Sequence, residues 1–301
     1  MKKILLIYFL SFHAISELTL EITQGTEDPY RVAIIKFSGA DKVSTDIQKV
    51  VFDNLIRTGE FTIFNNEDLL SIPQIEEDIV FNDFRILDID YLVMGKVEDD
   101  GLNIAVEYQV FDISKAKKIR TSTVYGIPNK NRQLAHYVSD GIYQEITGIP
   151  GIASTKILYV TEDNNFKLLI SDADGSNEQV LLESTEPIIS PSWSPDSKKV
   201  AYVSFETGIA KVYIQDIASG NREVAVENSS QISSPAWSPD GKFLSLTMYQ
   251  DGNAEIYILN LKNKNLTRLT NHYAIDTEST WSPKGSKIMS VSYTHLTLPT
   301  S

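Results

Sequence analysis

Residues 193–197 read Trp193-Ser194-Pro195-Asp196-Ser197, residues 237–241 read Trp237-Ser238-Pro239-Asp240-Gly241, and residues 281–285 read Trp281-Ser282-Pro283-Lys284-Gly285. These copies of one motif lie 44 residues apart and contain all 3 tryptophans of the 301-residue chain. A fixed period of this length, with one tryptophan in each unit, is typical of a β-propeller. The sequence therefore predicts successive, equivalent β-sheets whose loops form broad binding surfaces.

Four strands are expected in each repeat. In the unit around Trp193 they are the apolar stretch that ends at this tryptophan and the runs Val200 to Ser204, Lys211 to Ile217 and Arg222 to Val226. Alternating apolar and polar residues would place one face of each sheet against its neighbour, and proline presets the backbone of a tight turn. We therefore expect packing and turn formation to be the role of the blade residues Trp193, Pro195, Asp196, Trp237, Pro239, Asp240, Gly241, Trp281, Pro283 and Gly285.

The composition limits the classes of function. With 27 basic and 40 acidic residues the net charge is −13, which argues against a nucleic-acid surface because phosphates repel an acidic chain. The chain has no cysteine, which excludes disulfides and thiolate metal sites. The hydrophobic content of 42% is ample for a folded core.

The first residues predict a signal peptide over residues 1–16. Lys2-Lys3 precede an apolar run from Ile4 to Phe12, and small residues at Ala14 and Ser16 suit cleavage before Glu17. The run is too short for a helix that crosses a bilayer, which takes about 20 residues. We expect export to the periplasm and no transmembrane segment in the mature chain; an uncleaved anchor or a misread start is the alternative.

Residues 31–150 predict an α/β domain, so the expected fold class is an α/β N-terminal domain followed by an all-β propeller. Helices are expected at about 45–57 and 132–146, where apolar residues follow helical spacing. The expected strands are 31–37, 61–64 and 91–97, followed by an antiparallel pair at 103–112 and 118–125. The sequence Gly148-Ile149-Pro150-Gly151 should separate this domain from the propeller.

Signs of catalysis are weak. His136 and His272 are the only histidines of the expected folded regions and do not form a zinc motif; His136 is expected to be a surface or hydrogen-bonded helix residue. Asp172-x-Asp174-Gly175 resembles a fragment of a calcium loop but lacks its remaining acidic ligands, so a hairpin turn is expected. There is no Gly-x-Ser-x-Gly elbow, and no carboxylate pair stands out as a glycosidase site. We predict no catalytic residue, metal or cofactor.

The order of these features resembles the TolB family of the Tol-Pal system. The features that carry the resemblance are the signal, the first strand Val32-Ala33-Ile34-Ile35-Lys36-Phe37, the hinge from Ile146 to Ile149 and the tryptophan motifs. The stretches at 171–175 and 276–278 strengthen it, and it covers residues 1–291. It implies a non-enzymatic periplasmic scaffold that links inner-membrane TolA to the outer-membrane lipoprotein Pal. This system supports outer-membrane integrity and constriction during cell division.

The resemblance also implies the partner sites. The extended segment 17–30 would bind the C-terminal domain of TolA through Glu17, Leu18, Thr19, Leu20, Glu21, Ile22 and Thr23. Its alternating apolar residues suit strand addition to a sheet edge; pairing with its own domain is the alternative. Pal would contact the loops that lead into the tryptophan strands, with Gln231 and Thr277 as the first candidates, and ordinary solvated loops are the alternative. The full set of expected Pal-binding residues is Ile188, Gln231, Ile232, Ser233, Asp276 and Thr277.

The propeller is expected to be incomplete. From about Ile157 the chain holds 145 residues, enough for about 3.3 units of 44, whereas the family has six. We assign residues 151–291 to the incomplete propeller and 292–301 to a non-native tail. We expect this chain to express poorly or to self-associate, and a full-length protein to be monomeric. Other outer-membrane proteins could also bind the full-length protein. The alternative function is an exported propeller that binds or processes a small ligand such as a glycan.

Overall fold

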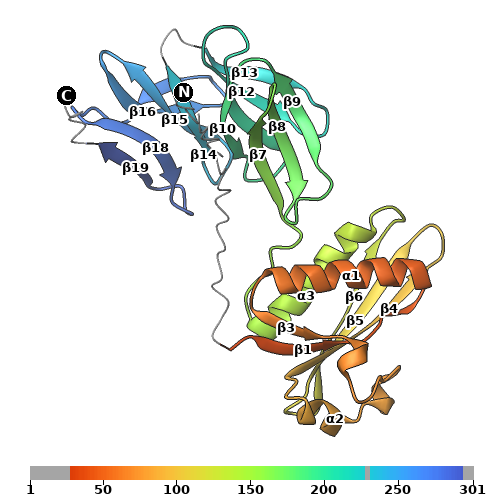
Figure 1. Cartoon of the computed structure of the whole chain (residues 1–301). Coiled ribbons are helices and arrows are strands. Elements are labelled where there is room, and N and C mark those ends of the chain that lie inside the picture. Colours follow the sequence, from red (N-terminus) through yellow and green to blue (C-terminus); the bar gives the residue numbers. More distant parts are fainter. Residues whose placement is uncertain (1–27, 228–230, 294–301) are drawn as a thin grey trace, which may run out of the picture. The chain divides into compact units, whose positions relative to one another are not determined.

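The computed structural model describes residues 28–227 and 231–293. The expected signal peptide, the segment 17–23 and residues 294–301 of the expected tail therefore lie outside the described residues. The chain divides into two compact units, Met1–Ile149 and Pro150–Ser301 (Figure 1). Each unit has hydrophobic cores of its own.

The first unit is a mixed β-sheet with helices on both faces. The strand order is β3-β1-β4-β5-β6, and the short β2 pairs with β4. Helices α1 and α3 pack over one face, and α2 lies on the other (Figure 1). The elements are β1 (Tyr30–Ile34), β2 (Ser38–Gly39), α1 (Asp41–Arg57), β3 (Phe61–Phe64), α2 (Phe81–Ile86), β4 (Tyr91–Asp99), β5 (Ile104–Asp112), β6 (Lys117–Gly126) and α3 (Asn131–Thr147), with 3₁₀ turns at Asn66–Asp68 and Glu76–Asp78.

Two hydrophobic cores hold this sheet. The first lies under α1 and α3 and includes Ile47, Val51 and Ile142, which are fully buried, so the apolar helix faces seen in the sequence are confirmed. The second lies on the opposite face and is closed by Phe84 of α2. The sequence patterns did not predict α2 or the 3₁₀ turns. Helix α3 ends where Gly148 adopts a left-handed φ of 75° and its N–H bonds the carbonyl of Gln144 at 2.9 Å.

The second unit is a row of antiparallel sheets. Two sheets have four strands, in the orders β10-β11-β12-β13 and β14-β15-β16-β17; they are flanked by the three-stranded β7-β8-β9 and the two-stranded β18-β19 (Figure 1). The strands are β7 (Lys156–Glu162), β8 (Phe166–Asp172), β9 (Gln179–Ser184), β10 (Ile188–Trp193), β11 (Lys199–Ser204), β12 (Lys211–Asp216), β13 (Arg222–Glu227), β14 (Ile232–Trp237), β15 (Phe243–Gln250), β16 (Asn253–Asn260), β17 (Leu266–Arg268), β18 (Ile275–Trp281) and β19 (Ile288–Tyr293). The predicted fold class is confirmed.

Neighbouring sheets pack face to face along this row. Strands β11 and β15 are buried on both faces, because each central sheet has a neighbour on either side. The expectation of one buried face for each sheet was therefore wrong for these strands. At the ends of the row the equivalent strands are open: Ile157 of β7 is 45% exposed and Met289 of β19 is 71% exposed, whereas Ala201 and Ser245 at the equivalent positions are fully buried.

Across 28–227 and 231–293, the helices are all too short or too polar to traverse a lipid bilayer.

Candidate protein-binding surface

The first strands of the sheets, β10, β14 and β18, contact one another in sequence and begin at a common end of the unit. Each strand contains one shift in its pairing register. The residue within this bulge has a left-handed backbone in all three strands: φ is 52° at Ser190, 52° at Ser234 and 53° at Glu278. Such a conformation is strained for a residue with a Cβ and recurs at functional sites, and bulges redirect side chains. The bulge lies between the expected Pal-binding residues and the tryptophan of each strand.

The tryptophans join successive sheets. The indole Nε1 of Trp237 donates to the carbonyl of Ser192 at 3.3 Å, and that of Trp281 donates to the carbonyl of Ala236 at 3.2 Å. Each acceptor lies in the first strand of the preceding sheet. The 44-residue period in the sequence therefore corresponds to a repeated hydrogen bond between sheets, in addition to apolar packing.

The Ser-Pro-Asp turns lie at the opposite end of the sheets and stabilise themselves. Ser194 Oγ donates to Asp196 Oδ1 at 2.7 Å and accepts from the N–H of Lys199 at 2.9 Å, and Ser238 and Asp240 repeat the arrangement. The hydrogen bond from serine is the main cause that lowers the pKa of both aspartates. In the third turn Lys284 replaces the aspartate, and only the serine hydroxyl and the glycine turn remain.

The expected Pal-binding residues occupy equivalent positions at the start of β10, β14 and β18. Gln231 is exposed, and Ser233 and Thr277 are half-buried. The side chains of Ile188, Ile232 and Asp276 are buried, and both isoleucines belong to hydrophobic cores, so they cannot offer their side chains to a partner. The Thr277 hydroxyl lies 3.2 Å from that of Thr247 in the preceding sheet. The exposed part of this row therefore centres on Gln231, Ser233 and Thr277.

Comparison with known proteins agrees with this architecture. A family model of the TolB beta propeller domain matches residues 143–295, and a model of the TolB amino-terminal domain matches residues 18–119. The chain belongs to the TolB family. The resemblance inferred from the sequence is thus confirmed, and the Tol-Pal system is the family context of the chain.

Individual relatives support the same assignment. The Tol-Pal system protein TolB of Alcanivorax borkumensis is 42% identical over 197 residues, which are 64% of this chain and 45% of that protein. The TolB protein of Alkalilimnicola ehrlichii is 38% identical over 202 residues, which are 64% of this chain and 47% of that protein. This TolB-family chain thus spans about half the length of the curated relatives it matches. The crystal structure of TolB from Acinetobacter baumannii has a TM-score of 0.82 at 34% identity and covers 89% of this chain and 67% of that one.

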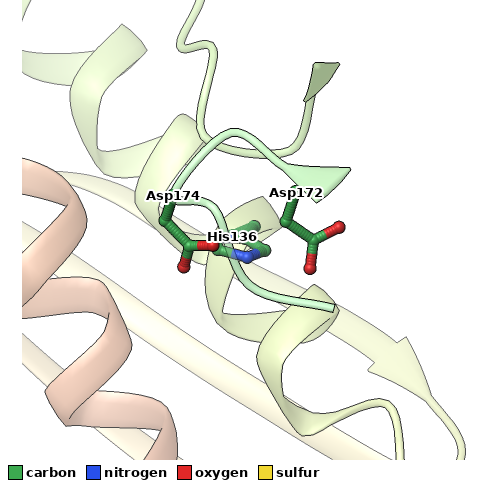
Figure 2. Close-up of side chains that lie close together, drawn as sticks. All are labelled: His136, Asp172 and Asp174. Atoms are coloured by element: carbon green, nitrogen blue, oxygen red, sulfur yellow. The ribbon is translucent and has the colours of Figure 1, made fainter. Parts of the chain in front are cut away.

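The aspartates that resemble part of a calcium loop form a hairpin turn. Asp172 ends β8 and Asp174 lies in the turn before β9, and Figure 2 shows both side chains on this turn. Asn177 Nδ2 donates to Asp172 Oδ2 at 2.6 Å, and the N–H of Ser176 donates to Asp174 Oδ1 at 2.9 Å. Lys156 pairs with Asp172 as well. The turn thus satisfies its carboxylates with its own neighbours.

His136, which Figure 2 also labels, belongs to α3 in the first unit. Its Nδ1 lies 2.9 Å from the amide Nδ2 of Asn54 in α1, and because an amide nitrogen can only donate, Nδ1 accepts this bond. The same amide donates to Ser139 Oγ at 2.9 Å. His136 is therefore a buried histidine that helps to join two helices. Of the two expectations for it, a hydrogen-bonded helix residue is the one that the structure shows.

Sequence reasoning missed Glu255, a carboxylate that is only 1% exposed at the start of β16. It accepts hydrogen bonds from Arg268 and Thr270 and from the N–H of His272. Burial would raise the pKa of Glu255, but these bonds outweigh burial and lower it, so Glu255 is charged at neutral pH. The sequence repeat could have indicated this site. Lys167 and Lys211 occupy the positions equivalent to Glu255 in the two preceding repeats, so the charge is reversed at 255.

Proposed function

We propose that this TolB-family chain acts as a non-enzymatic periplasmic scaffold that links inner-membrane TolA to the outer-membrane lipoprotein Pal, and so supports outer-membrane integrity and constriction during division. Membership of the TolB family carries this proposal. The row of loop-end residues Gln231, Ser233 and Thr277 supports a Pal contact at this end of the second unit. The segment 17–23, outside the described residues, would supply the TolA contact.

Calorimetric titration of the chain with the soluble domain of Pal tests the outer-membrane contact. The double variant Gln231→Ala/Thr277→Ala should raise Kd at least about fivefold, because one exposed and one half-buried contact side chain are removed. Gln179→Ala is a matched control, since this glutamine is also exposed but lies at the opposite end of its sheet. Failure of the wild-type chain to bind Pal would refute the scaffold proposal.

The TolA contact has a separate test. A chain that lacks residues 17–26 is titrated with the C-terminal domain of TolA and, in parallel, with Pal. We expect TolA binding to disappear and Pal binding to persist, because the Pal contact lies in the second unit. Unchanged TolA affinity would show that the segment is not the TolA site.

Two clefts favour a second function, the binding of a small ligand such as a glycan. They lie between the Ser-Pro-Asp turns of adjacent sheets and have volumes of about 550 and 510 Å³. Trp237 borders the first cleft and Trp281 the second, and sugars commonly bind against aromatic rings. Saturable quenching of tryptophan fluorescence by a short oligosaccharide would support this function, and a flat titration at millimolar concentration would reject it.

A further inference from the structure

The loop between β17 and β18 has an unusual exposed surface. Tyr273 is 79% exposed and Leu269 is 50% exposed. The stretch from Leu269 to Ile275 contains no Asp, Glu, Lys or Arg. The Tyr273 ring packs against the His272 ring, with a distance of 4.2 Å between their centroids. An aromatic side chain is thus held outward on an uncharged loop.

Hydrogen bonds fix the backbone of this loop on the core of its sheet. Glu255 accepts from the N–H of His272 at 2.8 Å, and Asn253 Nδ2 donates to the carbonyls of His272 and Ala274 at 2.6 and 2.7 Å. Arg268 bonds Glu255 at 2.9 Å and neutralises its charge. The loop is therefore preorganised, and a partner that binds it would not have to order it.

The loop leads directly into the expected contact row. The last carbonyl that Asn253 holds belongs to Ala274, and Asp276 and Thr277 follow in β18. We infer that Leu269 and Tyr273 form an apolar anchor for the Pal partner, next to Thr277, and that Glu255 is the positioning residue that presents this anchor. This inference rests on the proposed function. Exposed, rigidly held aromatic residues are typical energetic centres of protein interfaces, and an uncharged loop suits an apolar pocket on the partner.

Calorimetric titration of the full chain with the soluble domain of Pal tests this inference. We expect Tyr273→Ala to raise Kd about tenfold or more. Glu255→Gln should raise Kd severalfold, because the backbone of the loop loses its charged acceptor. Tyr125→Ala is the matched control: Tyr125 is 76% exposed but lies on β6 of the first unit, so Kd should not change.

A double-variant cycle separates positioning from a general loss of structure. If Glu255 acts by presenting Tyr273, the variant Glu255→Gln/Tyr273→Ala should bind no more weakly than Tyr273→Ala alone, within about twofold. Multiplied effects would refute the positioning role. If Glu255→Gln does not fold, Asn253→Ala takes its place in the cycle, because Asn253 is only half-buried and holds the same loop.

The outcomes distinguish this inference from the proposed function. Binding of Pal by the wild-type chain together with an unchanged Kd for Tyr273→Ala refutes the anchor and leaves the scaffold proposal intact. Absence of binding by the wild-type chain refutes both. A tenfold loss for Tyr273→Ala, no loss for Tyr125→Ala and a non-additive cycle establish the anchor.

Discussion

The substitution Leu246→Ala should strongly destabilise the second unit. Leu246 is fully buried on β15, in the core shared by the two four-stranded sheets. Removal of a buried leucine side chain costs about 3 kcal/mol or more, because apolar contacts are lost and a cavity remains. Tryptophan fluorescence in urea is the assay, since Trp193, Trp237 and Trp281 all lie in this unit. With a denaturant slope of about 2 kcal/mol per molar, the midpoint should fall by about 1.5 M.

Leu266→Ala is the matched control for this substitution. Leu266 lies on β17 of the same sheet but is 37% exposed, so the same atoms are removed from a site that water already reaches. We expect a loss below about 1 kcal/mol. Equal midpoint shifts for Leu246→Ala and Leu266→Ala would refute the conclusion that neighbouring sheets bury β15 on both faces.

Three further perturbations follow from the structure. Trp281→Phe removes the indole donor to the preceding sheet and should lower the free energy of unfolding by about 1–2 kcal/mol, measured by urea titration of the remaining tryptophan fluorescence. Burial would raise the pKa of Asp112, but hydrogen bonds, chiefly from Lys115, lower it to about 2. Since this pKa lies below the ordinary 3.8, the stabilisation by Asp112 is complete above about pH 4 and is lost as the pH falls through 2. Asp112→Asn should abolish about 1 kcal/mol of this pH-dependent stability, a value that allows for the exposure of Lys115. Far-ultraviolet circular dichroism during acid unfolding measures the loss. Ser234→Gly should be neutral or stabilise the fold by up to about 1 kcal/mol, because glycine tolerates the left-handed backbone. Ser233→Gly on the same strand should destabilise the fold. A lower melting temperature for Ser234→Gly than for Ser233→Gly would contradict this account.

Periodic features of the fold could be predicted from the sequence. The tryptophan period identified the sheets because the indoles of Trp237 and Trp281 make the same hydrogen bond, each to the first strand of the preceding sheet. Helices α1 and α3 of the first unit were also predictable, since residues such as Ile47 and Ile142 recur at helical spacing and are fully buried. Repetition indicates packing well because the copies in neighbouring sheets make equivalent contacts.

Features that depend on tertiary contacts could not be predicted in this way. The bulges at Ser190 and Ser234 have no glycine to mark a left-handed backbone, because the sheet enforces this conformation. The partner site stays a prediction. Gln231 is exposed, whereas Ile188 and Ile232 were chosen from loop position although their apolar character and spacing are those of core residues.

Hydrogen exchange of the chain with and without the soluble domain of Pal tests the central claim most directly, namely that one end of the second unit is a protein-binding surface. We predict that Pal slows exchange in peptides that cover residues 231–234 and 268–278, and leaves the Ser-Pro-Asp turns at 194–199 and 238–243 unchanged. Protection of the turns alone, or no protection in any peptide of the second unit, would contradict this account.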